Sequence, residues 1–423
     1  MSEAVVHVVG AGLAGLSTAL RLRAAGRRVA LWEAAGHAGG RCRSFFDMRL
    51  GRQIDNGNHL VLTGNQSVRD YLRLAGAPDA LAPAPEASFP FADLDSGAHY
   101  TVRINRGRLP WWIALPSRRV PGTRVADYLG GLALLRAGSG ATVAEAIRDR
   151  GPLWRGFWEP LTLAAINTTP ERASAQLLAR VVVETFGKGG EASRPMFAPH
   201  GLGPALVEPA LARLAAQGVA PTFGRTLRAI SRDGRRATTL VFADGEVALA
   251  PSDRVVLALP PSRLRPILPD LDLPGDSCAI LNAHFVVDDP ALAGMAPLTG
   301  VLGAVTQWIF VRGDVISLTV SAADALGLIE ADRDELTARL WRETRAALGL
   351  RTQDHNAARI IVEKRATFDQ SPQAVAKRAK AQTDMENLFL AGDATDTGLP
   401  ATIEGAIRSG EIAARLAAQG VLA

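Results

Sequence analysis

The chain has 423 residues, of which 48% are hydrophobic and 21% are charged, and its formal net charge at pH 7 is +5. This composition excludes a disordered chain, and the length favours two domains over one. The small positive charge does not predict a nucleic-acid partner. The two cysteines, Cys42 and Cys278, form no spacing pattern, so we expect neither a disulfide scaffold nor a metal site.

No run of about 18 uninterrupted apolar residues occurs, so we expect no transmembrane helix. The first apolar stretch starts at Val5, which leaves no room for a secretory signal peptide. We therefore expect a cytoplasmic protein, with contact to the inner face of the cytoplasmic membrane left open. The pattern of residues predicts no particular oligomeric state.

The first 33 residues contain the pattern around which the rest of the chain is interpreted. A buried strand is predicted over Val5–Val9, a glycine-rich turn over residues 10–15, then a helix, and a second strand over Arg28–Trp32. This order is the βαβ fingerprint of a dinucleotide-binding unit, in which a pyrophosphate lies at the helix N-terminus. Glu33 follows the second strand, where a carboxylate binds the ribose hydroxyls.

Three glycines of this turn have separate physical roles. Gly10 would allow the tight turn, Gly12 the approach of the backbone to the pyrophosphate, and Gly15 the close packing of helix on strand. A second glycine pair and an arginine, Gly39-Gly40-Arg41, follow within eight residues of Glu33. A nicotinamide cofactor does not require them, so they indicate a cofactor that extends past the pyrophosphate, as FAD does.

The last forty residues contain a second set of candidate cofactor contacts. An apolar strand over Asn387–Ala391 ends in Gly392-Asp393, and a helix is predicted over Ile403–Ala417. Asp393 is a candidate ligand of a ribityl hydroxyl. The helix N-terminus near Thr402 would stabilise the negative charge of a reduced flavin.

A polar stretch, residues 54–62, lies between apolar flanks in the first third of the chain. Gly57 in its middle predicts a close approach of the backbone to a neighbour. His59 is a candidate proton donor, although a hydrogen bond to a neighbouring loop is the more common role of a single histidine.

We predict an α/β fold with two domains. Helices are expected over 125–137, 143–150, 153–163 and 170–186, and alternating apolar strands over 276–320 precede a helix over 332–348. The predicted Rossmann-type FAD-binding domain is discontinuous and comprises residues 1–90, 200–262 and 385–423. The predicted α+β substrate-binding domain comprises residues 91–199 and 263–384 and contains an antiparallel sheet and helices.

The segment 103–124 combines six arginines with an aromatic tip and lacks any acid. The tip is Trp111-Trp112-Ile113. Basic residues around an aromatic apolar tip are typical of a monotopic contact with anionic lipid. A tryptophan pair in the core with solvated arginines around it explains the same residues, and both interpretations stay open.

Over its whole length the chain resembles the flavin-dependent amine oxidase and phytoene desaturase superfamily, through Gly10–Gly15, Glu33, Gly39-Gly40-Arg41 and Gly392-Asp393. The stretches 54–60, 158–161, 167–168, 365–368 and 391–406 are similar to those of the hydroxysqualene dehydroxylases, squalene-associated FAD enzymes of bacterial hopanoid pathways. The run 391–406 is the most specific of them.

The resemblance implies non-covalent FAD and the reductive removal of an allylic hydroxyl from hydroxysqualene, a long apolar isoprenoid, to give squalene. The implied cofactor contacts are Gly10, Gly12, Leu13, Ala14, Gly15, Glu33, Gly39, Gly40, Arg41, Asn56, Gly57, Leu227, Gly392, Asp393, Pro400, Ala401 and Thr402. The candidates for the proton donor are His59 first, then Asp55 and Glu404. Contact with the enzymes that precede it in squalene synthesis is a further expectation.

Three other functions stay open. A carotenoid or squalene-type desaturase would run the flavin oxidatively, and spacing alone does not assign the direction of electron flow. An amine oxidase would use an aromatic cage, but the chain has only three tyrosines, none in its second half. A prenyl-binding protein like the Rab GDP-dissociation inhibitors would not need the flavin contacts. A second dinucleotide fingerprint is missing, so electrons would come from transiently bound NAD(P)H or from another protein.

Overall fold

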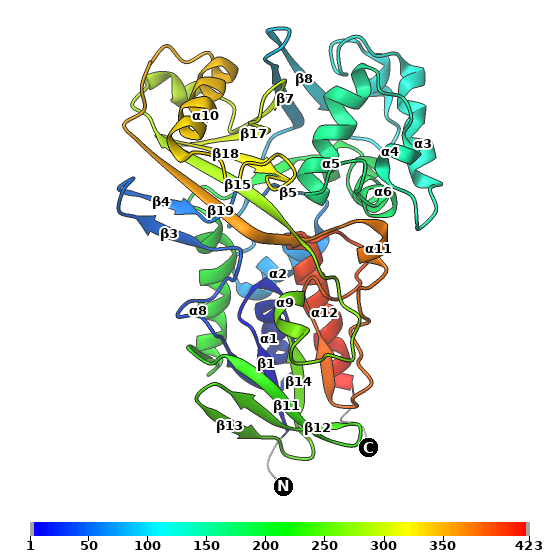
Figure 1. Cartoon of the computed structure of the whole chain (residues 1–423), viewed down its shortest axis with the longest axis vertical. Coiled ribbons are helices and arrows are strands. Elements are labelled where there is room, and N and C mark those ends of the chain that lie inside the picture. Colours follow the sequence, from blue (N-terminus) through cyan, green and yellow to red (C-terminus); the bar gives the residue numbers. More distant parts are fainter. Residues whose placement is uncertain (1–3, 420–423) are drawn as a thin grey trace.

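The computed structural model describes residues 4–419. Figure 1 shows an elongated molecule made of two parts stacked along its longest axis. The lower part contains both the N-terminal segment and the C-terminal helix. The upper part contains a large sheet with one long helix on one side and a group of shorter helices on the other. The predicted α/β fold class with a second domain is confirmed.

The lower part is built on a five-stranded parallel sheet in the order β10-β2-β1-β14-β20. Its strands are β1 (Val5–Val9), β2 (Arg28–Trp32), β10 (Pro221–Thr222), β14 (Arg254–Leu257) and β20 (Leu388–Leu390). Helices α1 (Leu13–Ala24) and α12 (Ile403–Gln419) pack on one face, and α2 (Gln66–Ala75) and α8 (Glu208–Ala216) pack against them. The apolar side chains of the strands explain this layering, because a parallel sheet buries both of its faces.

The other face of this sheet is covered by a three-stranded antiparallel sheet, β11-β12-β13. Its strands are β11 (Leu227–Asp233), β12 (Arg236–Phe242) and β13 (Gly245–Ala248). Leu240 and Phe242 join Val9 and Leu257 in one hydrophobic cluster. Residues 221–257 therefore complete the nucleotide-binding fold, as the alternation of strands in the sequence predicts.

The two ends of the chain meet where α1 crosses α12. A Cβ at Gly410 would overlap the carbonyl oxygen of Ala14, so only glycine permits this approach. The hydroxyl of Ser17 donates to the carbonyl of Ile407 at 2.9 Å, and that of Thr18 donates to the carbonyl of Gly410 at 3.2 Å. Because these contacts join residues about 390 positions apart, the first and last segments form one core.

The upper part is built on a seven-stranded sheet in the order β19-β15-β18-β17-β16-β7-β8. Its strands are β7 (Ala87–Asp93), β8 (Ala98–Ile104), β15 (Ser277–Val286), β16 (Leu298–Leu302), β17 (Trp308–Arg312), β18 (Val315–Ser321) and β19 (Ala357–Phe368). All neighbours are antiparallel except β16 and β7, which are parallel. The boundary predicted at residue 90 therefore falls inside a strand of this sheet.

Helix α10 (Arg333–Leu348) packs on one side of the large sheet, and the helices of residues 125–184 form a separate hydrophobic cluster with its other strands. These helices are η2 (Val125–Leu129), α3 (Gly130–Leu135), α4 (Val143–Ala146), the π-helical turn η3 (Trp154–Trp158), α5 (Glu159–Ile166) and α6 (Ala175–Glu184). The helices predicted over 143–150 and 170–186 are too long. Ile147 is extended, and Ser174 caps α6 by accepting the Leu177 N–H, so the real helix starts later than its apolar pattern.

Short elements connect these parts. They are β3 (Ser44–Asp47), β4 (Arg52–Asp55), β5 (Val61–Leu62), β6 (Ala82–Pro83), β9 (Pro195–Phe197), η1 (Trp111–Ala114), η4 (Phe186–Lys188), α7 (Gly190–Ser193), η5 (Gly203–Val207), α9 (Pro261–Leu264), η6 (Pro290–Gly294) and α11 (Pro372–Val375). Across residues 4–419, every helix is too short or too polar to cross a membrane.

Candidate active site

The glycine-rich turn between β1 and α1 has the shape that a dinucleotide requires. Gly10 has φ +104°, and a Cβ there would overlap the carbonyl oxygen of Ala258. A Cβ at Gly15 would overlap the carbonyl oxygen of Gly10, which is why helix and strand pack so closely. A Cβ at Gly12, in contrast, would meet no protein atom within 4 Å. The backbone at Gly12 therefore borders open space, into which a ligand can approach.

The second glycine pair lies directly against this turn. Gly39 and Gly40 have φ +100° and +58°, and a Cβ at Gly40 would lie 3.4 Å from the Cα of Gly12. Leu13 and Ala14 bury their side chains in the core, so only their backbone groups remain to contact a ligand. The structure thus brings together the two glycine motifs that the sequence places 27 residues apart.

Glu33 lies at the end of β2, and its carboxylate is held by backbone donors. Oε2 accepts the Ala11 N–H at 2.7 Å, and Oε1 accepts the Ala35 N–H at 2.8 Å. Both oxygens keep lone pairs that ribose hydroxyls can use. The Arg225 N–H donates to the Glu33 carbonyl at 2.9 Å, which brings Leu227, at the start of β11, to the same end of the sheet.

Arg41 and Asp393 join the two predicted halves of the cofactor site. Arg41 Nη1 lies 2.6 Å from Asp393 Oδ2 and also donates to the Ala366 carbonyl at 2.7 Å. Asp393 is buried, and its negative charge raises the pKa of Arg41. Gly392 has φ +96°, a conformation that glycine adopts without strain, and this turns the chain from β20 toward Arg41.

The start of α12 forms part of a cavity wall. Pro400, Ala401 and Thr402 line the cavity. Thr402 Oγ1 accepts the Gly405 N–H at 3.1 Å and thereby caps the helix, while the Ala401 N–H donates to Gln370 Oε1 at 2.7 Å. A helix N-terminus carries a partial positive charge, so this wall favours a negatively charged group.

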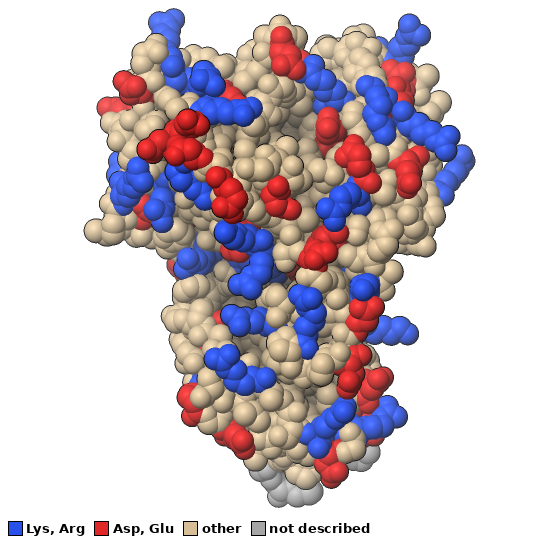
Figure 2. Space-filling view, viewed as in Figure 1, with Lys and Arg blue, Asp and Glu red and all other residues tan. Residues whose placement is uncertain are grey.

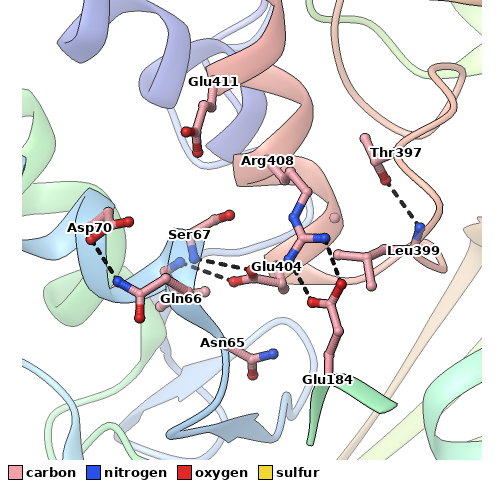
Figure 3. A network of polar contacts seen from close by, with 12 residues as sticks. Asn65, Gln66, Ser67, Asp70, Glu184, Thr397, Leu399, Glu404, Arg408 and Glu411 are labelled. Atoms are coloured by element: carbon pink, nitrogen blue, oxygen red, sulfur yellow. Dashed lines mark hydrogen bonds and ion pairs between the residues drawn. The ribbon is translucent and has the colours of Figure 1, made fainter. Parts of the chain in front are cut away.

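Glu404 is fully engaged with protein partners, as Figure 3 shows. Its two oxygens accept the N–H groups of Ser67 and Val68, both at 3.0 Å, at the first turn of α2. Arg408 also donates to Glu404 at 2.9 Å and pairs with Glu184 at 2.6 Å. These contacts tie α12 to α2, and because Glu404 also lines the cavity, its role as a proton donor stays a prediction.

Asp55 is also a structural residue. Its Oδ1 accepts a short hydrogen bond from the Ser44 hydroxyl and the Leu202 N–H at 2.8 Å, and its Oδ2 pairs with Arg312 Nη1 at 2.8 Å. The carboxylate is buried and is not among the residues that line the cavity. The prediction of Asp55 as an acid in the site is wrong, since it joins β4 to β17 and to the start of η5.

His59 is the one candidate acid of the three that keeps access to the cavity without a full set of partners. It is half-buried on the wall, next to Asn56 and Gly57. Burial lowers the pKa of His59, the negative charge of Asp55 opposes this change, and the positive charge of Arg41 adds to it. The imidazole is therefore neutral near pH 7, in a form that can donate one hydrogen bond.

The cavity lies between the two parts of the molecule and has a polar end and an apolar end. Its space not filled by protein atoms amounts to about 1560 Å³, including solvent at its mouth. The polar end holds Arg41, the stretch 56–59 and the start of α12. The apolar wall comes from α5, α6, η4, β16 and β17 and consists of Leu161, Ala164, Ala165, Val181, Phe186, Leu298, Trp308 and Phe310.

A polar cluster that was not predicted from the sequence also lines the cavity. Asn58 Nδ2 donates to Thr319 Oγ1 at 3.1 Å, and the Thr319 hydroxyl donates to Asn282 Oδ1 at 2.9 Å. All three residues line the cavity. Asn282 and Thr319 sit in ordinary apolar strands, β15 and β18. A polar residue in the middle of a buried strand was the available signal, since such a group needs a partner.

The arrangement fits a dinucleotide-containing flavin. Gly12 borders open space, the Glu33 carboxylate accepts the N–H of its neighbour Ala11, and the helix N-terminus at Thr402 lines the cavity. Both free cysteines are buried, and neither lines the cavity. The geometry therefore matches a flavin held without a cysteine linkage.

Comparison with known proteins defines the class. The chain belongs to the flavin containing amine oxidoreductase family, whose model matches residues 13–418. Cyclohexylamine oxidase from Brevibacterium oxydans has the same fold, with a TM-score of 0.72 and 14% identity over 99% of both chains. The chain is thus a flavin-dependent oxidoreductase.

Its relatives within that family are more specific. The chain is 44% identical to the hydroxysqualene dehydroxylase of Rhodopseudomonas palustris over 412 residues, which is 97% of each chain. It is 43% identical to the hydroxysqualene dehydroxylase of Sinorhizobium fredii, over 97% of this chain and 98% of that protein. The family resemblance inferred from the motifs is confirmed.

Proposed function

We propose that this protein is an FAD-dependent hydroxysqualene dehydroxylase that replaces the allylic hydroxyl of hydroxysqualene by hydrogen and releases squalene. The observation that carries the proposal is the two-ended cavity, whose polar wall meets the expected flavin position and whose other walls are apolar. In hydroxysqualene, the hydroxyl matches the polar end of the cavity and the hydrocarbon chain matches its apolar end. Two hydroxysqualene dehydroxylases are 44% and 43% identical to this chain over 97% of its length, which supports this function over the desaturase, amine oxidase and prenyl-binding alternatives.

The residues that would hold FAD follow from the site. Gly12 and the N-terminus of α1 would bind the pyrophosphate, and Glu33 the adenosine ribose. Arg41 and Asp393 would lie along the remaining phosphates and the ribityl chain. The N-terminus of α12 at Thr402 would face the pyrimidine end of the flavin.

When bound, the reduced cofactor supplies a hydride. The balance of the reaction is simple: the allylic C–O bond breaks, the hydroxyl leaves with one proton as water, and the carbon accepts the hydride. The protein must bring a hydrogen-bond donor to the leaving oxygen. It must also exclude bulk water, because loss of the hydroxyl leaves an allylic cation on the substrate that water would attack. The apolar wall from Leu161 to Phe310 performs the second task.

His59 is our candidate for the first task. It lies on the polar wall, and the two competing acids, Asp55 and Glu404, are engaged in structural contacts. The cluster of Asn58, Asn282 and Thr319 would position the substrate oxygen beside it. We propose that electrons reach the flavin from NAD(P)H that binds transiently, without a second nucleotide-binding domain.

Among the described residues, no tyrosine lines the cavity to form an aromatic cage for an amine. Tyr71 is buried and donates to the Leu206 carbonyl at 2.6 Å. Tyr100 and Tyr128 pack on Phe91 and Trp112, away from the cavity. The aromatic residues that do line the cavity, Phe186, Trp308 and Phe310, belong to its apolar wall, which favours an isoprenoid over an amine.

The test is an anaerobic single turnover. The purified flavoprotein is reduced, by dithionite in one arm and by NADPH or NADH in another, and mixed with hydroxysqualene. We expect the oxidised flavin spectrum to return while squalene accumulates in equal amount. Reduced enzyme that stays reduced, with hydroxysqualene unchanged, would refute the proposal. Oxidised enzyme that instead becomes reduced on mixing with a saturated or squalene-type isoprenoid would indicate a desaturase.

A further inference from the structure

One surface of the upper part contributes no residue to the lining of the cavity. Thirteen large hydrophobic residues are exposed among the described residues, and seven of them lie between positions 109 and 135. They are Leu109, Trp111, Leu115, Val125, Leu129, Leu132 and Leu135. We call this set the exposed apolar surface. Leu109 is 80% exposed and Leu129 is 61% exposed, which is unusual for leucine in a folded chain.

The residues of this surface come from neighbouring elements. Trp112 of η1 is buried and makes an edge-to-face contact with Tyr128 of η2, with ring centroids 5.3 Å apart. The helix α3 follows η2 directly. Trp112 is thus a core residue, whereas Trp111 is exposed. The interpretation of the pair as core residues applies to Trp112, and the interpretation as a membrane-contacting tip applies to Trp111.

Exposed arginines lie on the same stretch of chain as the exposed apolar surface. Arg103, Arg106, Arg108, Arg124 and Arg136 are exposed, and the Arg118 guanidinium lies 5.2 Å from the centre of the Trp111 ring. Within residues 4–419, the guanidinium groups of Arg103, Arg108 and Arg124 have no carboxylate oxygen within 4.0 Å. The nearby acids have partners of their own. Glu191 pairs with Arg106, and Asp127 accepts the backbone N–H of Arg124. Glu145 and Asp149, which lie near α3, accept the backbone N–H groups of Thr142 and Gly151.

We propose that the exposed apolar surface inserts into the interfacial layer of an anionic phospholipid bilayer, with Arg103, Arg108 and Arg124 bound to lipid phosphates. Bilayer contact requires apolar side chains rimmed by unpaired cations, and this is what the segment offers. The described helices do not cross a membrane, so the protein lies on the bilayer instead of spanning it. A second copy of the chain would carry the same positive charge, which makes it the poorer occupant.

The surface is placed to serve the cavity. Helix α3 packs against α6, and α6 contributes Val181 and Glu184 to the cavity wall while Val183 is exposed. In Figure 1, α3 and α6 lie on the side of the upper part opposite α10. Figure 2 shows that on the face drawn there, basic and acidic side chains are interspersed over the upper part. Charge alone therefore marks no docking surface on that face.

The proposal does not depend on the reaction. It is tested by co-sedimentation of the FAD-loaded protein with vesicles of phosphatidylcholine alone or with about 30% phosphatidylglycerol. We expect binding to the anionic vesicles and weak binding to the neutral ones. Each arginine near the surface contributes about a fivefold factor, so R103S/R108S/R124S should lower the partition coefficient on the order of 100-fold. The triple variant R333S/R342S/R351S, with the same charge change on α10 and after it, is the matched control and should bind like the natural protein.

Two further variants separate lipid insertion from self-association of the chain. L129Q/L132Q should lose vesicle binding, whereas L326Q, at an equally exposed leucine before α10, should keep it. Brominated lipids should quench part of the tryptophan fluorescence, and W111F should lose that part. Circular dichroism and flavin absorbance verify that each variant folds. Equal binding of both arginine triples, or a dimer in solution that L129Q/L132Q abolishes while vesicle binding persists, would overturn the proposal.

Discussion

Replacing Gly12 by Ala separates cofactor binding from folding. A Cβ at Gly12 would meet no protein atom within 4 Å, and the residue has φ −71° and ψ 177°, which alanine adopts readily. The apoprotein should therefore be as stable as the natural one or gain about 0.4–1 kcal/mol, because alanine has less conformational freedom in the unfolded chain. The added methyl group would occupy the space that the pyrophosphate needs.

The effect on FAD binding is set by the backbone hydrogen bond to the pyrophosphate that the new methyl group would prevent. One hydrogen bond from the backbone to a charged phosphate is worth about 1.5–3 kcal/mol, so the Kd for FAD should rise about 10- to 150-fold. The assay is titration of the apoprotein with FAD, followed by flavin fluorescence, together with the thermal midpoint of the apoprotein. Gly15→Ala is the contrasting variant. Its Cβ would overlap the Gly10 carbonyl, so it should destabilise even the apoprotein, by about 1–3 kcal/mol.

The reasoning about the turn would be refuted by two outcomes. One is a Gly12→Ala protein that binds FAD within about twofold of the natural protein. The other is a Gly12→Ala apoprotein that loses as much stability as Gly15→Ala, since the structure shows no protein atom for the new methyl group to strike.

Three other residues have distinct expected outcomes. Glu404→Gln should lower the free energy of unfolding by about 2 kcal/mol, because Ser67, Val68 and Arg408 lose a charged acceptor. The kcat of the FAD-loaded variant should stay within about threefold of the natural enzyme's kcat. A large loss of kcat with unchanged stability in urea would contradict the structural role. His59→Ala should lower kcat about 10²-fold with FAD binding retained, and His59→Gln should recover part of the lost kcat. If the imidazolium is the donor, kcat of the natural enzyme rises as pH falls below about 6.5, because the pKa of His59 is lowered. Full turnover by His59→Ala would remove His59 from the mechanism. Burial lowers the pKa of His284 to about 4, so as pH falls the unfolded chain takes up this proton before the folded protein does. The free energy of unfolding should therefore be highest above pH 6.5 and fall by up to about 3 kcal/mol as pH drops to 4. His284→Asn should make that dependence on pH weaker, as measured by urea titrations at several pH values.

Cofactor recognition was predictable from sequence because it depends on local backbone shape. The turn at Gly10 needs a positive φ, Gly15 needs a missing side chain, and Glu33 must end the second strand. Each requirement is met by residues within one βαβ unit, so it leaves a pattern at fixed spacing. The run after β20 also has a local pattern, but its ion pair with Arg41 became visible only in the folded chain.

The proton donors were harder to predict, because the partners of a carboxylate are not visible in the sequence. Asp55 and Glu404 have the residue type that an acid catalyst needs, and both lie in stretches that resemble those of the hydroxysqualene dehydroxylases. Arg312, 257 positions away, neutralises one of them, and the first turn of α2, 337 positions away, binds the other. Only the folded chain decides whether a carboxylate faces a ligand or a structural cation.

The chain's sequence alone determined the class of cofactor and the two-part fold, since glycine positions, strand periodicity and the acid after β2 act over short distances. The tertiary structure decided which polar side chains face the cavity, because the wall is assembled from the stretch at His59, the strands of Asn282 and Thr319 and the start of α12. It also decided which member of the tryptophan pair is exposed. Burial is a property of the packed whole, and no spacing of residues along the chain records it.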